Sequence, residues 1–155
     1  MAITAADVNK LRKQTGAGMM DCKKALVETD GDFEAAVDVL RKKGQKVAAK
    51  RGDNEASEGL IFAQTTEDGK TGVMVRLNCE TDFVAKNDDF RGFVQSLVDI
   101  AMKNMPASID ELKAAAYDDK LTVAEKITEH VGVVGEKLDL SAFDVVNADS
   151  VVAYN

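Results

Sequence analysis

The chain has 155 residues, of which 45% are hydrophobic and 30% are charged, and its formal net charge is −7. This length suits one domain of ordinary size or a small domain plus a medium one, and the lack of an apolar run near ~18 residues excludes a membrane-spanning helix. The N-terminus lacks the basic and apolar regions of a secretory signal, so we expect a globular cytoplasmic protein with no membrane partner.

The charge is uneven along the chain. Residues 1–52 carry 11 Lys and Arg against 7 Asp and Glu, and the remainder carries 9 against 20. The acidic remainder disfavours general binding to a phosphate backbone. The first part has one basic cluster, formed by Arg41, Lys42, Lys43, Lys46, Lys50 and Arg51. It could contact RNA, but it lacks interleaved aromatic residues, so a solvated helix end is favoured and we expect no direct nucleic-acid partner.

Residues 3–43 predict three short helices that form a minimal bundle. Thr4 is a good N-cap with Asp7 three residues later, and the segment Gly16–Gly18 breaks the apolar pattern at a tight turn. A second helix is predicted over Met19–Glu28. Ala5, Val8 and Leu11 form one apolar stripe on the first helix, and Cys22, Ala25 and Leu26 share one face of the second.

The third helix is predicted to begin after Asp32 and to end at Gly44, because glycine commonly follows a helix. Residues 44–57 are polar and predict a linker that is helical in part, between Gln45 and Lys50. We therefore expect two domains, with a three-helix domain and linker helix over residues 1–52 and an α+β subdomain over residues 53–155.

The second part predicts a small antiparallel sheet with packed helices. Leu60–Thr65 and Thr71–Leu77 flank an Asp-Gly turn and predict a β-hairpin. Apolar residues recur at helical spacing from Asp88 to about Lys103. Two shorter helices are expected, over Ile109–Ala116 and from Thr122 to about His130, because a capping residue stands at the start of each. One or two strands are expected from Val133 to the C-terminus.

The segment Thr81–Ala85, with the sequence TDFVA, follows the second predicted strand and precedes a helix. A bare phenylalanine is unusual at such a turn. Phe83 could fold back as a core plug, which its apolar ring alone favours. Alternatively, Phe83 could be a wedge for an apolar pocket of a partner, with Asp82 supplying a charge beside it.

Met19 and Met20 are adjacent at the start of the second helix, so their side chains point about 100° apart. One interpretation places one of them in the core and the other at its rim. The other interpretation is an adaptable apolar patch that fits a helix of a partner protein.

No catalytic or cofactor site emerges from the sequence. Gly16-Ala17-Gly18 continues into Met19-Met20 and lacks the Gly-Lys-Ser/Thr ending of a phosphate-binding loop. Cys22 and Cys79 are the only cysteines and His130 is the only histidine, which is too few soft ligands for a zinc site. Two buried thiols are expected. The sequence thus predicts a binding protein with no cofactor and no metal, and not an enzyme.

Two separate segments carry a family resemblance: TDFVA, at Thr81–Ala85, and LRKQTGAGMMDCKKAL, at Leu11–Leu26. Both resemble the elongation factor Ts family, which promotes nucleotide exchange on elongation factor Tu. The resemblance runs from about Ile3 to the C-terminus and weakens after Lys126. Because family members continue beyond the point that matches Asn155, the chain resembles the first half of such a protein, and we expect it to be truncated.

The resemblance implies a ubiquitin-associated-type three-helix bundle followed by an α+β core. It also implies two sites that bind elongation factor Tu. A wedge that releases the nucleotide would consist of Thr81, Asp82, Phe83 and Val84. An anchor on the bundle would consist of Leu11, Arg12, Met19, Met20 and Lys23, with Ile127 as a weaker contact. The alternative is an adaptor that uses the bundle to bind another protein, which would leave Asp82 and Phe83 without a role.

Overall fold

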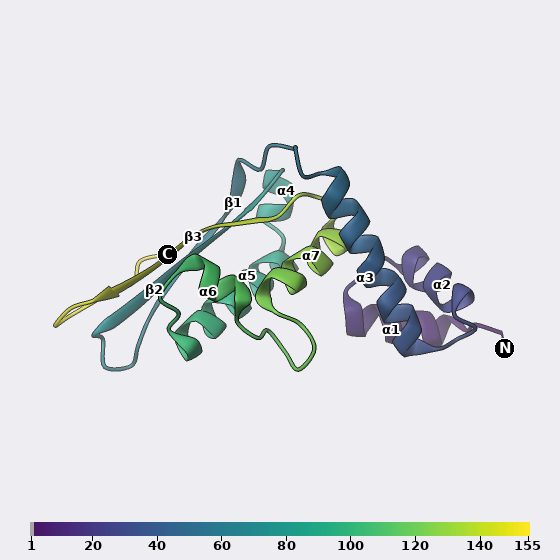
Figure 1. The fold of residues 1–155 in the computed structure, drawn as a ribbon, viewed down its shortest axis with the longest axis horizontal. Helices are drawn as coiled ribbons and strands as arrows, with labels where there is room; N and C mark the ends of the chain where they lie inside the picture. Colours follow the sequence, from purple (N-terminus) through teal and green to yellow (C-terminus); the bar gives the residue numbers. More distant parts are fainter. Residues whose placement is uncertain (1) are drawn as a thin grey trace. The chain divides into compact units, whose positions relative to one another are not determined.

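The computed structural model describes residues 2–155 and has an α+β fold (Figure 1), which confirms the predicted fold class. Its elements, in chain order, are α1 (Ala5–Thr15), α2 (Met19–Glu28), α3 (Phe33–Lys50), β1 (Glu58–Thr65), β2 (Thr71–Cys79), α4 (Asp82–Ala85), α5 (Asp88–Asn104), α6 (Ile109–Ala114), α7 (Val123–Val134) and β3 (Asp139–Asn147).

The chain divides into two compact units. Unit 1 comprises Met1–Asp53 and Thr128–Glu136, and unit 2 comprises Asn54–Ile127 and Lys137–Asn155. The second half of α7 therefore packs with the N-terminal helices, although it lies far from them in sequence. The predicted domain division between residues 52 and 53 stays a prediction.

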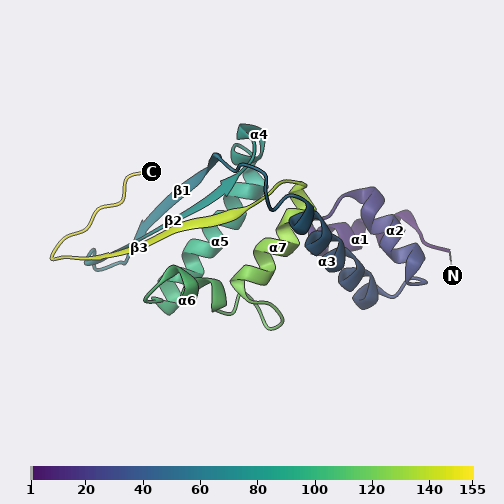
Figure 2. The ribbon, with the colours of Figure 1, turned by 45° about the horizontal axis from the view of Figure 1, so that its top comes forward.

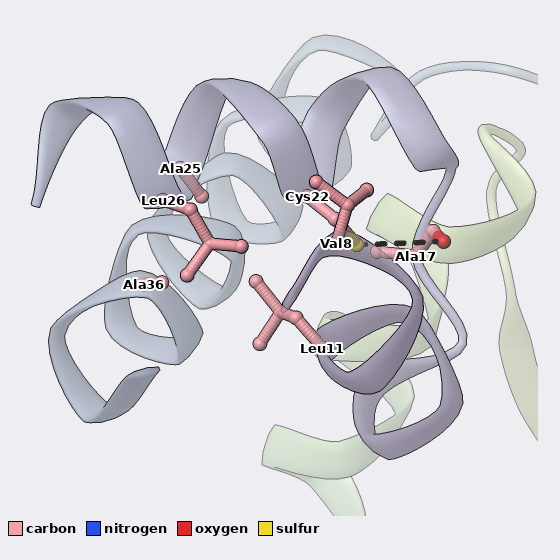
Figure 3. Packing of buried hydrophobic residues seen from close by; sticks show 7 residues of the cluster. All are labelled: Val8, Leu11, Ala17, Cys22, Ala25, Leu26 and Ala36. Atoms are coloured by element: carbon pink, nitrogen blue, oxygen red, sulfur yellow. Dashed lines mark hydrogen bonds between the residues drawn. The ribbon is translucent and has the colours of Figure 1, made fainter. Parts of the chain in front are cut away.

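The bundle of unit 1 forms largely as the sequence predicts. Thr4 and Asp7 make a complete capping box at the start of α1, and Gly16 ends that helix in the left-handed conformation with φ of 73°. Buried side chains of α1, α2 and α3 and of the connecting turn meet in one cluster, which Figure 3 shows: Val8, Leu11, Ala17, Cys22, Ala25, Leu26 and Ala36. Of the predicted apolar stripe of α1, Val8 and Leu11 are buried and Ala5 is exposed. It lies in the first turn of α1, beyond the edge of the cluster.

Gly44 does not end the third helix, because α3 continues to Lys50. The reason is a close approach between α3 and the second half of α7. A Cβ atom on Gly44 would lie 3.0 Å from the carbonyl oxygen of Thr128, and one on Gly132 would lie 2.7 Å from the Cα atom of Gly44. Gly44 is thus a packing glycine within a helix, and the segment Gln45–Lys50 belongs to that helix.

Unit 2 is built on a three-stranded antiparallel sheet in the order β1-β2-β3. The predicted hairpin is present, with Gly69 in the left-handed conformation at its turn. Helix α5 packs against β1 and β2, and Figure 2 shows α5 and α6 on the same side of the sheet. The apolar residues that α5 buries are Phe90, Phe93, Val94, Leu97, Val98 and Ala101.

The ends of two later helices differ from the predicted ones. Helix α6 ends at Ala114 and not at Ala116. Helix α7 runs to Val134 and not to about His130, and it is followed by Gly135 with φ of 74°. One strand, β3, follows α7, in agreement with the predicted one or two strands. The last eight residues, 148–155, lie outside the sheet. The side chain of Asn155 exchanges hydrogen bonds with the backbone of Ala63 on β1, at 2.8 Å each.

Candidate partner-binding site

Helix α4 is a single turn, and Thr81 caps its N-terminus. The hydroxyl of Thr81 accepts a hydrogen bond from the backbone N–H of Val84 at 3.4 Å. Below it, the thiol of Cys79 donates to the carbonyl of Thr81 at 3.2 Å. The helix packs against β1, β2 and α5. One turn is too short to be stable alone, so these surroundings hold it in place.

Phe83 points away from this packing and is 83% exposed. The core-plug interpretation is therefore wrong. Its apolar ring favoured burial, but α5 already fills the space beside the sheet with two other phenylalanines, Phe90 and Phe93. Thr81, Asp82 and Val84 are half-buried around the base of Phe83. The four residues of the predicted wedge thus form one small surface, with an apolar ring projecting from a braced turn.

The carboxylate of Asp82 pairs with Lys86 of the same turn. The Lys86 ammonium lies 2.7 Å from Asp82 Oδ2, and this hydrogen bond and charge hold the pKa of the Asp82 carboxyl below its ordinary value. The same contact raises the pKa of Lys86. Solvent reaches both charged groups, so the pair contributes little stability. The lowered pKa keeps the Asp82 carboxylate ionised at neutral pH, one residue before Phe83.

The two methionines of the predicted anchor are both exposed. Met19 is 52% exposed and Met20 is 63% exposed, on the first turn of α2. The interpretation that buries one of them in the core is therefore wrong. Cys22 and Ala17 occupy that part of the bundle interior, and the Cys22 thiol donates to the Ala17 carbonyl at 3.7 Å, as Figure 3 shows. We call Met19 and Met20 the methionine patch.

The other predicted anchor residues differ in their exposure. Arg12 and Lys23 are exposed and belong, like the methionine patch, to unit 1. Leu11 has no exposed surface, because it lies at the centre of the bundle. Ile127, in α7, is also buried. Leu11 and Ile127 thus offer little or no surface to a partner in this structure.

Part of the basic cluster is engaged in ion pairs within unit 1. The Arg41 guanidinium lies 3.2 Å from a carboxylate oxygen of Asp38 and 3.4 Å from one of Glu129. The Lys43 ammonium lies 2.5 Å from a carboxylate oxygen of Asp21 on α2. These contacts make Arg41 and Lys43 parts of the bundle's own packing.

The part of the chain that the structure describes contains no group of three or more His, Cys, Asp and Glu side chains that could hold a metal ion. Cys22 and Cys79 are both buried and free, as predicted. Burial raises the pKa of the Cys22 thiol, which keeps it in its unreactive protonated form at neutral pH. Within residues 2–155, every helix is too short or too polar to cross a bilayer.

The sequence matches known proteins over nearly its whole length. A family model described as "Elongation factor TS" matches residues 80–155. Elongation factor Ts of Christiangramia forsetii is 55% identical over 152 residues, which are 98% of this chain and 54% of that protein.

The chain belongs to the elongation factor Ts family. Two further relatives of that name are 51% identical, from Amoebophilus asiaticus, and 49% identical, from Parabacteroides distasonis. They align with 99% and 100% of this chain and are themselves covered to 55% and 46%. The chain spans about half the length of the relatives it matches, and the predicted resemblance to elongation factor Ts is confirmed.

Proposed function

We propose that the chain acts in translation as a guanine-nucleotide exchange factor, which promotes release of GDP from elongation factor Tu in the cytoplasm. The observation that carries this proposal is the exposure of Phe83 on a braced turn within the TDFVA segment. The elongation factor Ts name of the relatives supports the assignment of the partner.

The proposed mechanism needs no contact with the nucleotide. GDP on such a GTPase is held by a phosphate cradle and Mg²⁺. A factor that binds the empty GTPase more tightly than the loaded one weakens nucleotide binding by the same ratio, because the two binding equilibria are linked. Phe83 would enter an apolar pocket between the elements of the partner that brace the phosphate and Mg²⁺ sites. Burial of the ring contributes roughly 1.5–3 kcal/mol, which helps to offset the cost of separating those elements.

Asp82 and the methionine patch have supporting roles in this proposal. Asp82 would exchange its pairing with Lys86 for donors that the displaced parts of elongation factor Tu expose. The methionine patch, with Arg12 and Lys23, would bind a second surface of the same partner. Such an anchor raises the effective concentration of the wedge at its pocket.

The direct test is release of fluorescently labelled GDP from elongation factor Tu, chased with excess unlabelled GDP, at increasing concentrations of the chain. The proposal predicts a saturable acceleration over spontaneous release. A chain that binds elongation factor Tu without accelerating release would contradict the exchange role. A chain that neither binds nor accelerates would instead favour the adaptor interpretation, in which the bundle serves another partner.

A further inference from the structure

Glu80 joins three segments of unit 2 at the base of α4. It lies between the last residue of β2 and the N-cap Thr81. Its carboxylate accepts hydrogen bonds from the side-chain amide of Asn54, at 3.2 Å to each oxygen, and from the backbone N–H of Lys137 at 2.7 Å. The Lys137 ammonium in turn donates to the Asn54 carbonyl at 3.1 Å. These contacts close a ring, which we call the Glu80 clasp.

The two segments that meet on Glu80 are the places where the chain passes into unit 2. Asn54 is the first residue of unit 2 after Asp53, and Lys137 is the first after Glu136. The remaining passage between the units runs inside helix α7, between Ile127 and Thr128. The two non-helical connections into unit 2 are thus tied to one carboxylate, and that carboxylate is three residues before Phe83.

We propose that Glu80 is a positioning residue for nucleotide exchange, because the Glu80 clasp fixes the start of α4 and thereby the direction in which Phe83 projects. The inference rests on the proposed function, in which Phe83 is the wedge. Glu80 itself need not touch the partner.

Three physical arguments support this role. Hydrogen bonds to an ionised carboxylate are stronger than those between neutral groups, and the one from the Lys137 N–H is partly buried, which limits competition from water. The clasp acts on the residue next to the N-cap of a one-turn helix, which cannot hold its own orientation. A wedge works only when its supporting residues hold it within a fraction of an ångström of the productive geometry.

Two substitutions separate positioning from simple loss of charge. Glu80→Ala removes both acceptor oxygens, whereas Glu80→Gln keeps one carbonyl oxygen that can accept from Lys137. Glu67→Ala changes the net charge in the same way as Glu80→Ala, at an exposed position after β1 in the hairpin turn, and is the matched control. Each variant is made in the whole chain. Amide hydrogen exchange of Lys137 and of α4 is measured beside stimulated GDP release from elongation factor Tu over a range of factor concentrations.

We expect Glu80→Ala to speed amide exchange in α4 and to lower the maximal rate of GDP release about tenfold, with the half-saturating concentration within about twofold of the unsubstituted chain. Glu80→Gln should retain most of that rate, and Glu67→Ala should change neither quantity. The proposal is overturned if Glu80→Ala leaves α4 as protected as before, or if it loosens α4 and the maximal rate is unchanged.

If the unsubstituted chain does not stimulate GDP release, the proposed function fails separately. Hydrogen exchange alone then tests whether the Glu80 clasp fixes the start of α4. Faster exchange in α4 with Glu80→Ala, but not with Glu67→Ala, supports it, and equal protection in both variants overturns it.

Discussion

At the scale of single residues, the exposure of Phe83 matters because of where the ring sits. Isolated apolar side chains on a protein surface are common and need no explanation. Phe83, however, projects from a turn that is capped by Thr81 and supported by the Cys79 thiol. A braced support reduces the conformational entropy lost when the ring enters a pocket, which favours binding.

The pairing of Asp82 with Lys86 makes a prediction about pH. Because the folded pKa of Asp82 lies below its ordinary value, the pairing is intact at neutral pH and is lost as the pH falls through that lowered pKa. Lys86 has a raised pKa, so the pairing is also lost as the pH rises through that raised value. An NMR titration of the Asp82 carboxyl should give a midpoint below the usual value for aspartate. In Lys86→Gln the midpoint should return toward that value, and an unchanged midpoint would contradict the assigned cause.

At the scale of elements, the exposure of the methionine patch on the first turn of α2 leads to a prediction about partner binding. Replacing both Met19 and Met20 with Asp should weaken binding to elongation factor Tu more than about tenfold, because exposed apolar contacts are replaced by charge. The helix should persist, since carboxylates are favourable near a helix N-terminus. Binding is measured by titration and helicity by circular dichroism.

Val27→Asp is the control for the methionine variant. Val27 is 58% exposed and lies in the last turn of the same helix, so it tests whether any exposed apolar residue of α2 gives the effect. Unchanged affinity in the methionine double variant would mean that the methionine patch does not bind elongation factor Tu. Loss of helical content in that variant would mean that the two methionines are needed for folding.

The contact between α3 and α7 in unit 1 makes a prediction about stability. Gly132→Ala should destabilise the protein by about 1–3 kcal/mol, because its methyl group would meet the backbone of Gly44 and would force the helices apart. Gly92→Ala is the matched control in α5, where a Cβ would meet nothing within 4 Å. It should be neutral or stabilising by up to about 1 kcal/mol, because alanine favours helix. Equal melting temperatures for the two variants would contradict the close approach.

Local signals in the sequence were sufficient for most elements. The capping pair Thr4 and Asp7, the Asp-Gly hairpin turn and the apolar spacing of α5 each depend on neighbours within a few residues, and all were predicted correctly. Gly44 was assigned wrongly because its partner, Gly132, is distant in sequence. The local pattern of a glycine after a run of basic residues is typical of a helix end, and only the packing shows otherwise.

The candidate site was predictable in its composition but not in its geometry. A one-turn helix is too short for periodicity to indicate which side chains face the core, so the exposure of Phe83 could not be derived from spacing. Leu11 and Met19 lie close together in the N-terminal motif, yet one is buried and the other is exposed. The contacts of Glu80 could not be predicted from local sequence patterns, because Asn54 and Lys137 are 26 and 57 residues away along the chain.

At the scale of the whole molecule, the proposed wedge and anchor lie in different units. Phe83 belongs to unit 2, and the methionine patch belongs to unit 1. If both bind the same GTPase, loss of the wedge should reduce exchange while binding through the anchor persists. This separation between binding and exchange is what distinguishes an exchange factor from an adaptor.

The most direct measurement compares Phe83→Ala with the unsubstituted chain in stimulated GDP release from elongation factor Tu and in thermal unfolding. If Phe83 is the wedge, release should slow at least about tenfold, equivalent to ~1.4 kcal/mol of lost coupling. Residual binding to the GDP-bound form should remain, and stability should stay within about 0.5 kcal/mol, because the ring is exposed. An unchanged rate of release, in a chain that otherwise stimulates it, would contradict the wedge. A loss of several kcal/mol in stability, as expected for a buried phenylalanine, would contradict it equally.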